Sequence, residues 1–299
     1  MIRGRRKALF IGCNYTGQAN ELKGCINDCH NMAAFIMSKY GFQDDNILML
    51  TDDQDDPDYL PTAEHIVSGM HWLVYDAMPG DSLFFHFSGH GMSHCALDGD
   101  EADGFDEAIC PMDYKESGVI VDDMLHEILV RPLQPGVRLT AVFDCCHSGT
   151  ALDLPYVYQC DGEIQVCTES YRGAAAKAFV EMARNAVYAA GQLMEGIKLL
   201  RKKGDNKDAQ RKTEQMKTSM ADVIMFSGCR DDQTAADLYA MEQATGALST
   251  ALIATLSEDG EQTYTELLRN LRRKMKGQFT QVPQLSTGHP MDMNIRFMM

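Results

Sequence analysis

The chain has 299 residues, of which 45% are hydrophobic, and it carries a formal net charge of −16 at pH 7. This length suits one large domain or two small ones, and the acidic balance argues against nucleic-acid binding, which needs a basic surface. The negative charge suits a bound cation or a cationic substrate, although solubility alone explains it equally well. No hydrophobic run approaches the roughly 20 residues of a membrane-spanning helix, so we expect no membrane partner.

The ten cysteines lie mostly within hydrophobic runs, which indicates reduced thiols in an intracellular protein rather than a disulfide framework. Because no Cys-x-x-Cys pair occurs, a structural zinc site is not expected. The basic start of the chain is followed by a hydrophobic run too short for a signal peptide, so we interpret that run as a first strand.

Strands and helices alternate along the first 90 residues. Hydrophobic runs typical of buried strands fall at 7–13, 46–51 and 82–87. A first helix is predicted from a cap at Asn27 or Asp28 to Gly41. A second helix is predicted from Thr62 to Pro79. This alternation predicts a parallel sheet covered by helices on both faces.

From 92 to 108 the sequence is a loop rich in Asp and Gly. The two short runs beyond it are interpreted as a small β-hairpin, 109–112 with 118–121. A helix is then predicted from 122 to 130, and a fourth strand at 139–143.

Residues 150–221 interrupt the alternation and end in a basic stretch at 198–217, so we interpret them as an insertion. Regular structure resumes afterwards, with elements predicted at 222–227 (strand), 247–257 and 263–276 (helices) and 291–298 (strand). The interpretation is a single domain over 1–299, in which residues 1–150 and 222–299 flank the inserted segment, 151–221.

Chemically reactive residues follow two of the predicted strands. One strand ends in His90 and Gly91, and the other ends in Asp144, Cys145 and Cys146. If the two strands are neighbours, His90 and Cys146 lie side by side at the carboxyl edge of the sheet, where sites form in open α/β folds. A Cys and a His so placed suggest a nucleophile and its proton-transfer partner. The N–H groups of Gly91 and Cys146 are natural donors to an oxyanion.

Two other kinds of cysteine site do not fit the sequence. A tyrosine-phosphatase loop needs Cys-x5-Arg, but Leu152 stands six residues after Cys146, and a thioredoxin-like site needs Cys-x-x-Cys. If Cys146 and His90 are considered without their flanking motifs, a packed thiol and a hydrogen-bonded core histidine would be the simpler interpretation. Because side chains alternate along a strand, Asp144 and Cys146 share a face, and Cys145 is predicted to pack on the opposite one.

The motifs Phe85–Gly91 and Phe143–Gly149 resemble those of type I metacaspases, a family of caspase-like cysteine peptidases. Further similar segments extend the resemblance over residues 5 to 299: 24–31, 152–156, 227–237 and 283–286. The resemblance implies the caspase-hemoglobinase fold, an α/β architecture with a central, mostly parallel six-stranded sheet flanked by helices and a small β-hairpin insertion. It also implies that Cys146 is the nucleophile and His90 its dyad partner.

The family cleaves after Arg or Lys, and the resemblance carries its acidic substrate pocket onto Cys25, Asp28, Ser88 and Asp144. Two buried carboxylates in one pocket repel each other unless a guanidinium or ammonium enters, which is a physical reason for a basic P1 residue. Two simpler interpretations stay open, a helix cap for Asp28 and a turn at the strand end for Asp144.

The Asp-rich loop at 98–107 is not an EF-hand, because its fifth position is Ala102 and its sixth is not Gly. The resemblance instead implies a calcium site formed by separated carboxylates, Asp106, Asp122, Asp123 and Asp153. Asp122 and Asp123 could otherwise serve as cap and dipole partners of their helix.

The resemblance further implies a zymogen that cuts itself within the basic stretch 198–217, although that stretch could also be a solvated helix face. The implied protein is a calcium-dependent endopeptidase of programmed cell death. It would act as a monomer in the cytoplasm or the nucleus on protein or peptide substrates with a basic P1 residue. It would have no nucleic-acid or membrane partner. The alternative function is a caspase-fold scaffold with a mainly non-proteolytic role in stress or aggregate clearance.

Overall fold

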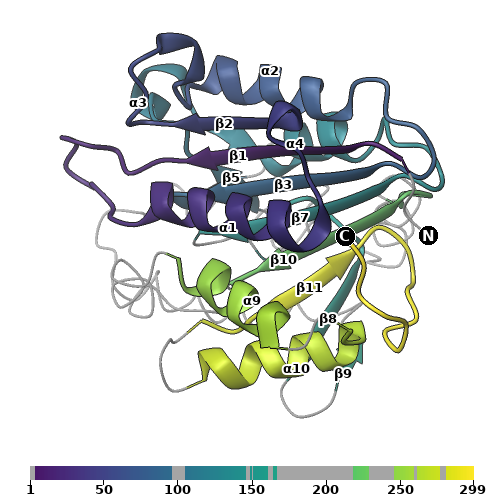
Figure 1. Cartoon of the computed structure of the whole chain (residues 1–299). Helices are drawn as coiled ribbons and strands as arrows, with labels where there is room; N and C mark the ends of the chain where they lie inside the picture. The colour runs from purple at the N-terminus through teal and green to yellow at the C-terminus, as the bar shows by residue number, and fades with distance from the viewer. Residues whose placement is uncertain are drawn as a thin grey trace, which may run out of the picture.

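A computed structural model describes residues 4–95, 105–145, 149, 151–160, 164–166, 218–228, 246–258, 261–276 and 281–299. Its centre is an eight-stranded sheet with the order β2-β1-β3-β7-β10-β11-β8-β9 (Figure 1). The five parallel strands are β1 (Arg6–Gly12), β2 (Ile47–Thr51), β3 (Ser82–Ser88), β7 (Arg138–Asp144) and β10 (Asp222–Ser227). The antiparallel strands are β11 (Gln284–Thr287), β8 (Tyr156–Cys160) and β9 (Ile164–Val166).

Helices cover both faces of this sheet, as the alternating sequence predicts. On one face lie α2 (Ala63–Val74) and α4 (Asp122–Leu129), and on the other lie α1 (Cys25–Tyr40), α9 (Ala247–Glu258) and α10 (Tyr264–Met275) (Figure 1). The shorter helices are α3 (Tyr114–Ser117) and the 3-10 turns η1 (Asp44–Asn46) and η2 (Pro57–Tyr59). Among the described residues, no helix is both long enough and apolar enough to cross a membrane.

Alternation of side chains along the central strands forms two separate cores. Phe85, Phe87 and Phe143 pack on the α2 and α4 face, whereas Phe84 and Val142 pack on the α1 and α9 face. Each strand buries both of its faces, so its sequence is a continuous hydrophobic run rather than an alternating one.

The sheet is larger than the six strands expected. The additional pair, β8 and β9, comes from the segment interpreted as an irregular insertion, and it extends the sheet beyond β11. Within that segment, residues 161–163 and 167–217 lie outside the described part of the chain. Residues on either side of the insertion, 1–150 and 222–299, share the single sheet because β10 pairs with β7.

Three local predictions were wrong. The last strand is β11 at Gln284–Thr287, not 291–298, because the hydrophobic side chains beyond it pack on the core without joining a ladder. The first helix begins at Cys25 after Gly24, so neither Asn27 nor Asp28 caps it. The second helix already ends at Val74 rather than at the Pro-Gly pair.

The predicted small hairpin is part of a three-stranded antiparallel sheet, β4 (Gly91–Cys95), β5 (Phe105–Ile109) and β6 (Ile120–Val121). The second half of the prediction was correct, since β6 pairs with β5. The first half was displaced, because the strand lies at 105–109 instead of 109–112.

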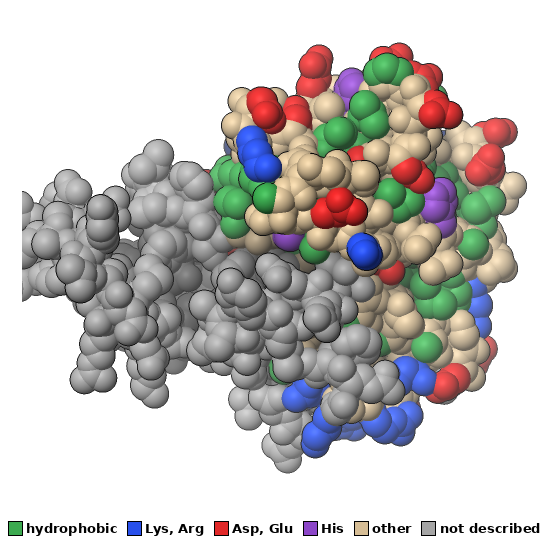
Figure 2. All heavy atoms as spheres, turned by 90° about the vertical axis from the view of Figure 1, so that its left-hand side faces the viewer, with side chains coloured by type: hydrophobic (Ala, Val, Ile, Leu, Met, Phe, Trp, Pro, Cys, Tyr) green, Lys and Arg blue, Asp and Glu red, His purple; other side chains and the backbone are tan. Residues whose placement is uncertain are grey.

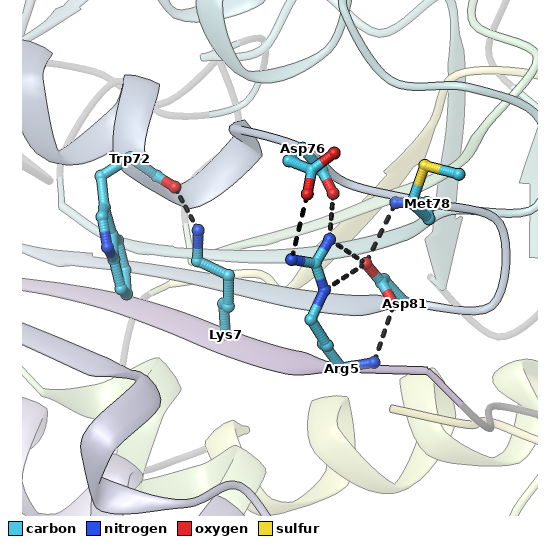
Figure 3. A network of polar contacts seen from close by, with 6 residues as sticks. All are labelled: Arg5, Lys7, Trp72, Asp76, Met78 and Asp81. Carbon is cyan, nitrogen blue, oxygen red and sulfur yellow. Dashed lines mark hydrogen bonds and ion pairs between the residues drawn. The ribbon is translucent and has the colours of Figure 1, made fainter.

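A polar network fixes the beginning of β1 against the loop before β3 (Figure 3). The guanidinium of Arg5 lies 3.1 Å from Oδ2 of Asp81, and its backbone N–H donates to Oδ1 of Asp81 at 2.7 Å. The ammonium of Lys7 lies 4.3 Å from the centre of the Trp72 ring. These contacts lie at the edge of the sheet where β1 and β3 begin, away from the motifs that follow β3 and β7.

Candidate active site

The two reactive motifs lie on neighbouring strands. β3 and β7 are parallel, and their last residues, Ser88 and Asp144, are directly paired. The two strands are therefore neighbours, as expected, and His90 lies two residues beyond the end of β3 at this edge of the sheet. Cys146 itself lies outside the described residues, so its predicted role as nucleophile stays a prediction.

A hydrogen bond to Asn20 orients the His90 ring. Its Nε2 lies 2.7 Å from the carbonyl oxygen of Asn20, and a carbonyl can only accept, so Nε2 carries the proton in the neutral ring. Nδ1 of the neutral ring is then unprotonated, which is the state that a general base requires.

Tyr15 contacts His90 through both its ring and its hydroxyl. The ring centres lie 4.7 Å apart, and the Tyr15 hydroxyl accepts the His90 backbone N–H at 2.9 Å while donating to the Cys110 carbonyl at 2.6 Å. Tyr15 is buried and has φ of 54°, a conformation that a bulky residue rarely adopts. A Cβ at Gly89 would lie 2.9 Å from the Tyr15 hydroxyl, so this approach requires glycine there.

Neither Tyr15 nor Asn20 was predicted from the sequence, because both lie in a polar loop with no periodicity to single them out. Gly91 begins β4, where it is aligned with Ile109. Its predicted role as a donor to an oxyanion stays a prediction.

All four residues predicted for the substrate pocket lie together. The hydroxyl of Ser88 donates to Oδ2 of Asp28 at 3.1 Å, and it also hydrogen-bonds the thiol of Cys25, whose pKa burial raises to about 12. Asp144, paired with Ser88 across the strands, completes the group. Asp28 and Asp144 are 7% and 1% exposed, so an ion pair formed here would be shielded from water.

The two carboxylates differ in their surroundings. Burial raises the pKa of Asp28 to about 7, and the negative charge of Asp144 adds to the rise, whereas the Ser88 hydroxyl opposes it. Burial also raises the pKa of Asp144, but the Ser249 N–H, 2.8 Å from Oδ2, opposes this rise. Among the described residues, Oδ1 of Asp144 is buried without a hydrogen-bond donor. Backbone N–H groups of Leu248 and Gly246 also lower the pKa of Asp144, so the start of α9 surrounds this carboxylate with donors.

Three of the four predicted calcium ligands form a cluster. Asp122, Asp123 and Asp153 each present a carboxylate oxygen, and these oxygens lie within 4.8 Å of one another. Asp122 is oriented by the Glu107 N–H, which donates to its Oδ2 at 2.8 Å. Clustered carboxylates of this kind suit a hard cation with oxygen ligands. The backbone of Asp106 lies in β5, but its side chain lies outside the described part of the chain.

The cluster joins the start of α4 to the segment at Asp153, and β5 contacts it through Glu107. Asp122 and Asp123 begin α4, Glu107 is in β5, and Asp153 follows the segment that contains Cys146. Nδ1 of His126 on α4 lies 2.8 Å from the carbonyl of Leu152, which ties the residue before Asp153 to the same helix. The Asp-rich positions 98–103 and the basic stretch 198–217 lie outside the described residues.

Comparisons with known proteins agree on one family. A family model described as "Metacaspase, peptidase C14 domain" matches residues 6–155. Metacaspase-1 of Cryptococcus neoformans is 48% identical over 299 residues, which cover 98% of this chain and 65% of that protein. Metacaspase-1B of Aspergillus clavatus is 49% identical over 300 residues, which cover 99% of this chain and 72% of that protein.

The fold is also found among solved structures. A crystal structure of a Geobacter sulfurreducens protein aligns over 97% of this chain and 95% of its own length, with a TM-score of 0.58 and 23% identity. This likeness concerns the fold alone.

Proposed function

Because the chain belongs to the metacaspase family of peptidase C14 domains, we propose that it is a calcium-dependent cysteine endopeptidase that cleaves after Arg or Lys. The observation that carries the proposal is the pair of buried carboxylates, Asp28 on α1 and Asp144 at the end of β7. Both contact Ser88 at the end of β3, two residues before His90. A guanidinium or an ammonium entering between them would relieve their repulsion and donate hydrogen bonds to both. An acidic P1 side chain would instead meet two like charges.

The proposed reaction uses His90 as base and then as acid. Nδ1 of His90 takes the thiol proton of Cys146, and the thiolate attacks the carbonyl carbon of the basic P1 residue. The N–H groups of Gly91 and Cys146 stabilise the oxyanion. His90 then returns the proton to the leaving amine, the acyl-enzyme forms, and water activated by His90 hydrolyses it. The carbonyl of Asn20 keeps the imidazole oriented throughout.

Asp122, Asp123 and Asp153 would hold the calcium ion, with Asp106 as a further ligand. Bound calcium would neutralise these carboxylates and hold the segment after Cys146 against α4. Self-cleavage would fall in the basic stretch 198–217, which carries the P1 residues that such an enzyme requires.

The decisive experiment compares fluorogenic peptides that end in Arg, Lys, Asp or citrulline, the uncharged analogue of Arg. We expect calcium-dependent cleavage after Arg and Lys, little after citrulline or Asp, and none by Cys146→Ala. Equal cleavage after Arg and citrulline would contradict the role of the carboxylates. No cleavage of any peptide with calcium present would contradict the peptidase and favour the scaffold function.

Self-processing is tested on the same two proteins. With calcium, the wild type should yield fragments whose ends, read by mass spectrometry, follow Lys or Arg within 198–217, while Cys146→Ala remains intact. Fragmentation of purified Cys146→Ala would show that the cut is not made by this chain.

A further inference from the structure

A line of buried polar side chains connects α1, β3 and α9 and leads to Asp144. Nδ1 of His86 on β3 lies 3.5 Å from Sγ of Cys29 on α1. Its Nε2 lies 2.9 Å from Oγ of Ser249 on α9. Ser249 in turn hydrogen-bonds Asp144 through its backbone N–H, at 2.8 Å, and through its side chain. His86, Cys29 and Ser249 are all at most 1% exposed.

The hydrogen bonds in this line can be given a direction. Burial lowers the pKa of His86 to about 3, so the ring is neutral and only one of its nitrogens carries a proton. Burial raises the pKa of Cys29 well above its usual value, so the thiol keeps its proton and can donate. The thiol then donates to Nδ1, Nε2–H donates to Oγ of Ser249, and the Ser249 hydroxyl donates to the Asp144 carboxylate. If the proton were on Nδ1 of His86 instead, Nε2 would be an acceptor and the Ser249 hydroxyl would donate to it. The hydroxyl would then no longer donate to the Asp144 carboxylate, which is the stronger acceptor.

We propose that His86 is a positioning residue for the basic P1 pocket, acting through Ser249 on the carboxylate of Asp144. This proposal rests on the function proposed above. The Ser249 N–H and hydroxyl both donate to Asp144 and so orient its carboxylate. Oδ1 has no hydrogen-bond partner among the described residues, so it is the oxygen that would accept from an incoming cation. His86 touches neither the substrate nor the reacting atoms.

The same turn of α9 also contacts the second acid of the pocket. A Cβ placed on Gly246, the residue before α9, would lie 2.4 Å from Oδ1 of Asp28. The first turn of α9 therefore lies against both carboxylates, and the bond from His86 to Ser249 holds this turn on β3. Because α9 follows the inserted segment in the chain and β3 precedes it, the pocket depends on how these two regions fit together.

Two substitutions separate positioning from a purely structural role. His86→Leu removes the donor to Ser249, whereas His86→Gln keeps an amide N–H close to the position of Nε2 and should restore it. The probe is agmatine, which carries a guanidinium but no scissile bond, and its binding is measured by calorimetry on the Cys146→Ala background. We expect agmatine to bind about tenfold more weakly to the Leu variant and within about twofold of the parent value to the Gln variant.

Kinetics on the otherwise wild-type chain should agree. KM for Arg peptides should rise about tenfold in His86→Leu while kcat changes little, because ground-state binding is what is lost. Ser249→Ala should have the same effect, and it also decides the matter if His86→Leu does not fold. A variant with both His86→Leu and Ser249→Ala should have a KM no higher than that of the more impaired single variant, because both substitutions interrupt the same line of hydrogen bonds.

Three results would overturn the proposal: unchanged agmatine affinity in Ser249→Ala, equal losses in the Leu and Gln variants, or strictly additive effects. Failure of the proposed function is recognised separately, because it would appear in the wild type as absent cleavage after Arg. If the wild type cleaves and binds agmatine but the variants match it, the inference about His86 alone fails.

Discussion

At the residue scale, the ionisation of Asp28 links stability to substrate binding. An unfolded carboxyl is ionised above about pH 4, whereas burial and the charge of Asp144 raise the pKa of folded Asp28 to about 7. The folded state therefore binds a proton that the unfolded state has released, so this group lowers the stability as pH rises from about 4 to about 7. A P1 guanidinium binds best when the Asp28 carboxyl is ionised. The affinity of the protein for a guanidinium should therefore fall as pH drops below about 7.

Asp28→Asn should raise Tm at pH 8 by about 3 °C. This increase in Tm should become smaller below pH 6, because the carboxyl of the parent protein is then neutral as well. Agmatine binding to the Cys146→Ala parent should weaken between pH 8 and pH 5.5, and the Asn variant should bind weakly at every pH. A higher Tm for the parent than for the variant at pH 8 would contradict the raised pKa.

Tyr15 supports a second prediction at this scale. Tyr15→Phe removes the hydroxyl between the His90 N–H and the Cys110 carbonyl but keeps the ring beneath the imidazole. We expect kcat for Arg peptides to fall about tenfold with KM nearly unchanged, because the base is misplaced while the pocket is intact. Tyr59→Phe, at an exposed tyrosine, is the matched control. A change in KM alone would show that Tyr15 serves the pocket rather than His90.

At the element scale, the start of α4 and the segment around Asp153 form the candidate metal centre. Asp122→Asn keeps the shape of the side chain and removes one negative charge from the cluster. We expect calcium to bind the Cys146→Ala protein at least about tenfold more weakly, by calorimetry, when this change is added. Glu127→Gln, an exposed position of the same helix paired with Arg131, should leave calcium affinity unchanged. Equal affinity in all three proteins would contradict the ligand set.

Elements whose hydrophobic pattern faces a core were predictable from the sequence. The strands before His90 and Cys146, and the helices α9 and α10, lie close to their expected positions. β11 was not predictable in this way, because its alternate residues Gln284 and Ser286 are polar although they are buried. Gln284 donates to the carbonyl of Gly149, so a contact distant in sequence explains why a polar side chain is buried there.

At the scale of the whole molecule, the network at the beginning of β1 and the site occupy opposite edges of one sheet. Burial works against the charge of Asp81, but the hydrogen bonds from Met78 and Arg5 outweigh it, and the pKa of Asp81 is lowered. A lowered folded pKa contributes stability above the unfolded value near 4, and that stability is lost as pH falls through the folded pKa.

Asp81→Asn should therefore lower the free energy of unfolding by about 2 kcal/mol at pH 7, measured by urea titration, with a smaller difference near pH 3. Because the network is remote from the pocket, kcat and KM of the folded variant should match the wild type. Asp76→Asn, at an exposed carboxylate on the same guanidinium, should cost much less. Similar losses for the two variants would contradict the importance of burial at Asp81.

Charge is also distributed over the whole molecule. Viewed toward the edge at which β1 and β2 end, acidic side chains are spread over the upper part of the surface, and most of the basic ones gather near the lower edge (Figure 2). This distribution agrees with the net charge of −16. An acidic surface near the strand ends favours the approach of basic substrates.

The α/β class, the run of parallel strands and the position of reactive residues just after two of them could all be predicted from the amino-acid sequence. This was possible because strand burial and strand ends leave local patterns. The grouping of Asp28, Ser88 and Asp144 was expected, but from the family resemblance rather than from any local pattern. The folded chain was needed to reveal the other contacts between distant residues: His90 with Tyr15 and Asn20, and Asp144 with Ser249, which in turn contacts His86. No periodicity encodes such contacts, because they depend on how the sheet orders its strands and seats its helices. The pKa of Asp28 is set by this burial, so it too is a property of the folded chain.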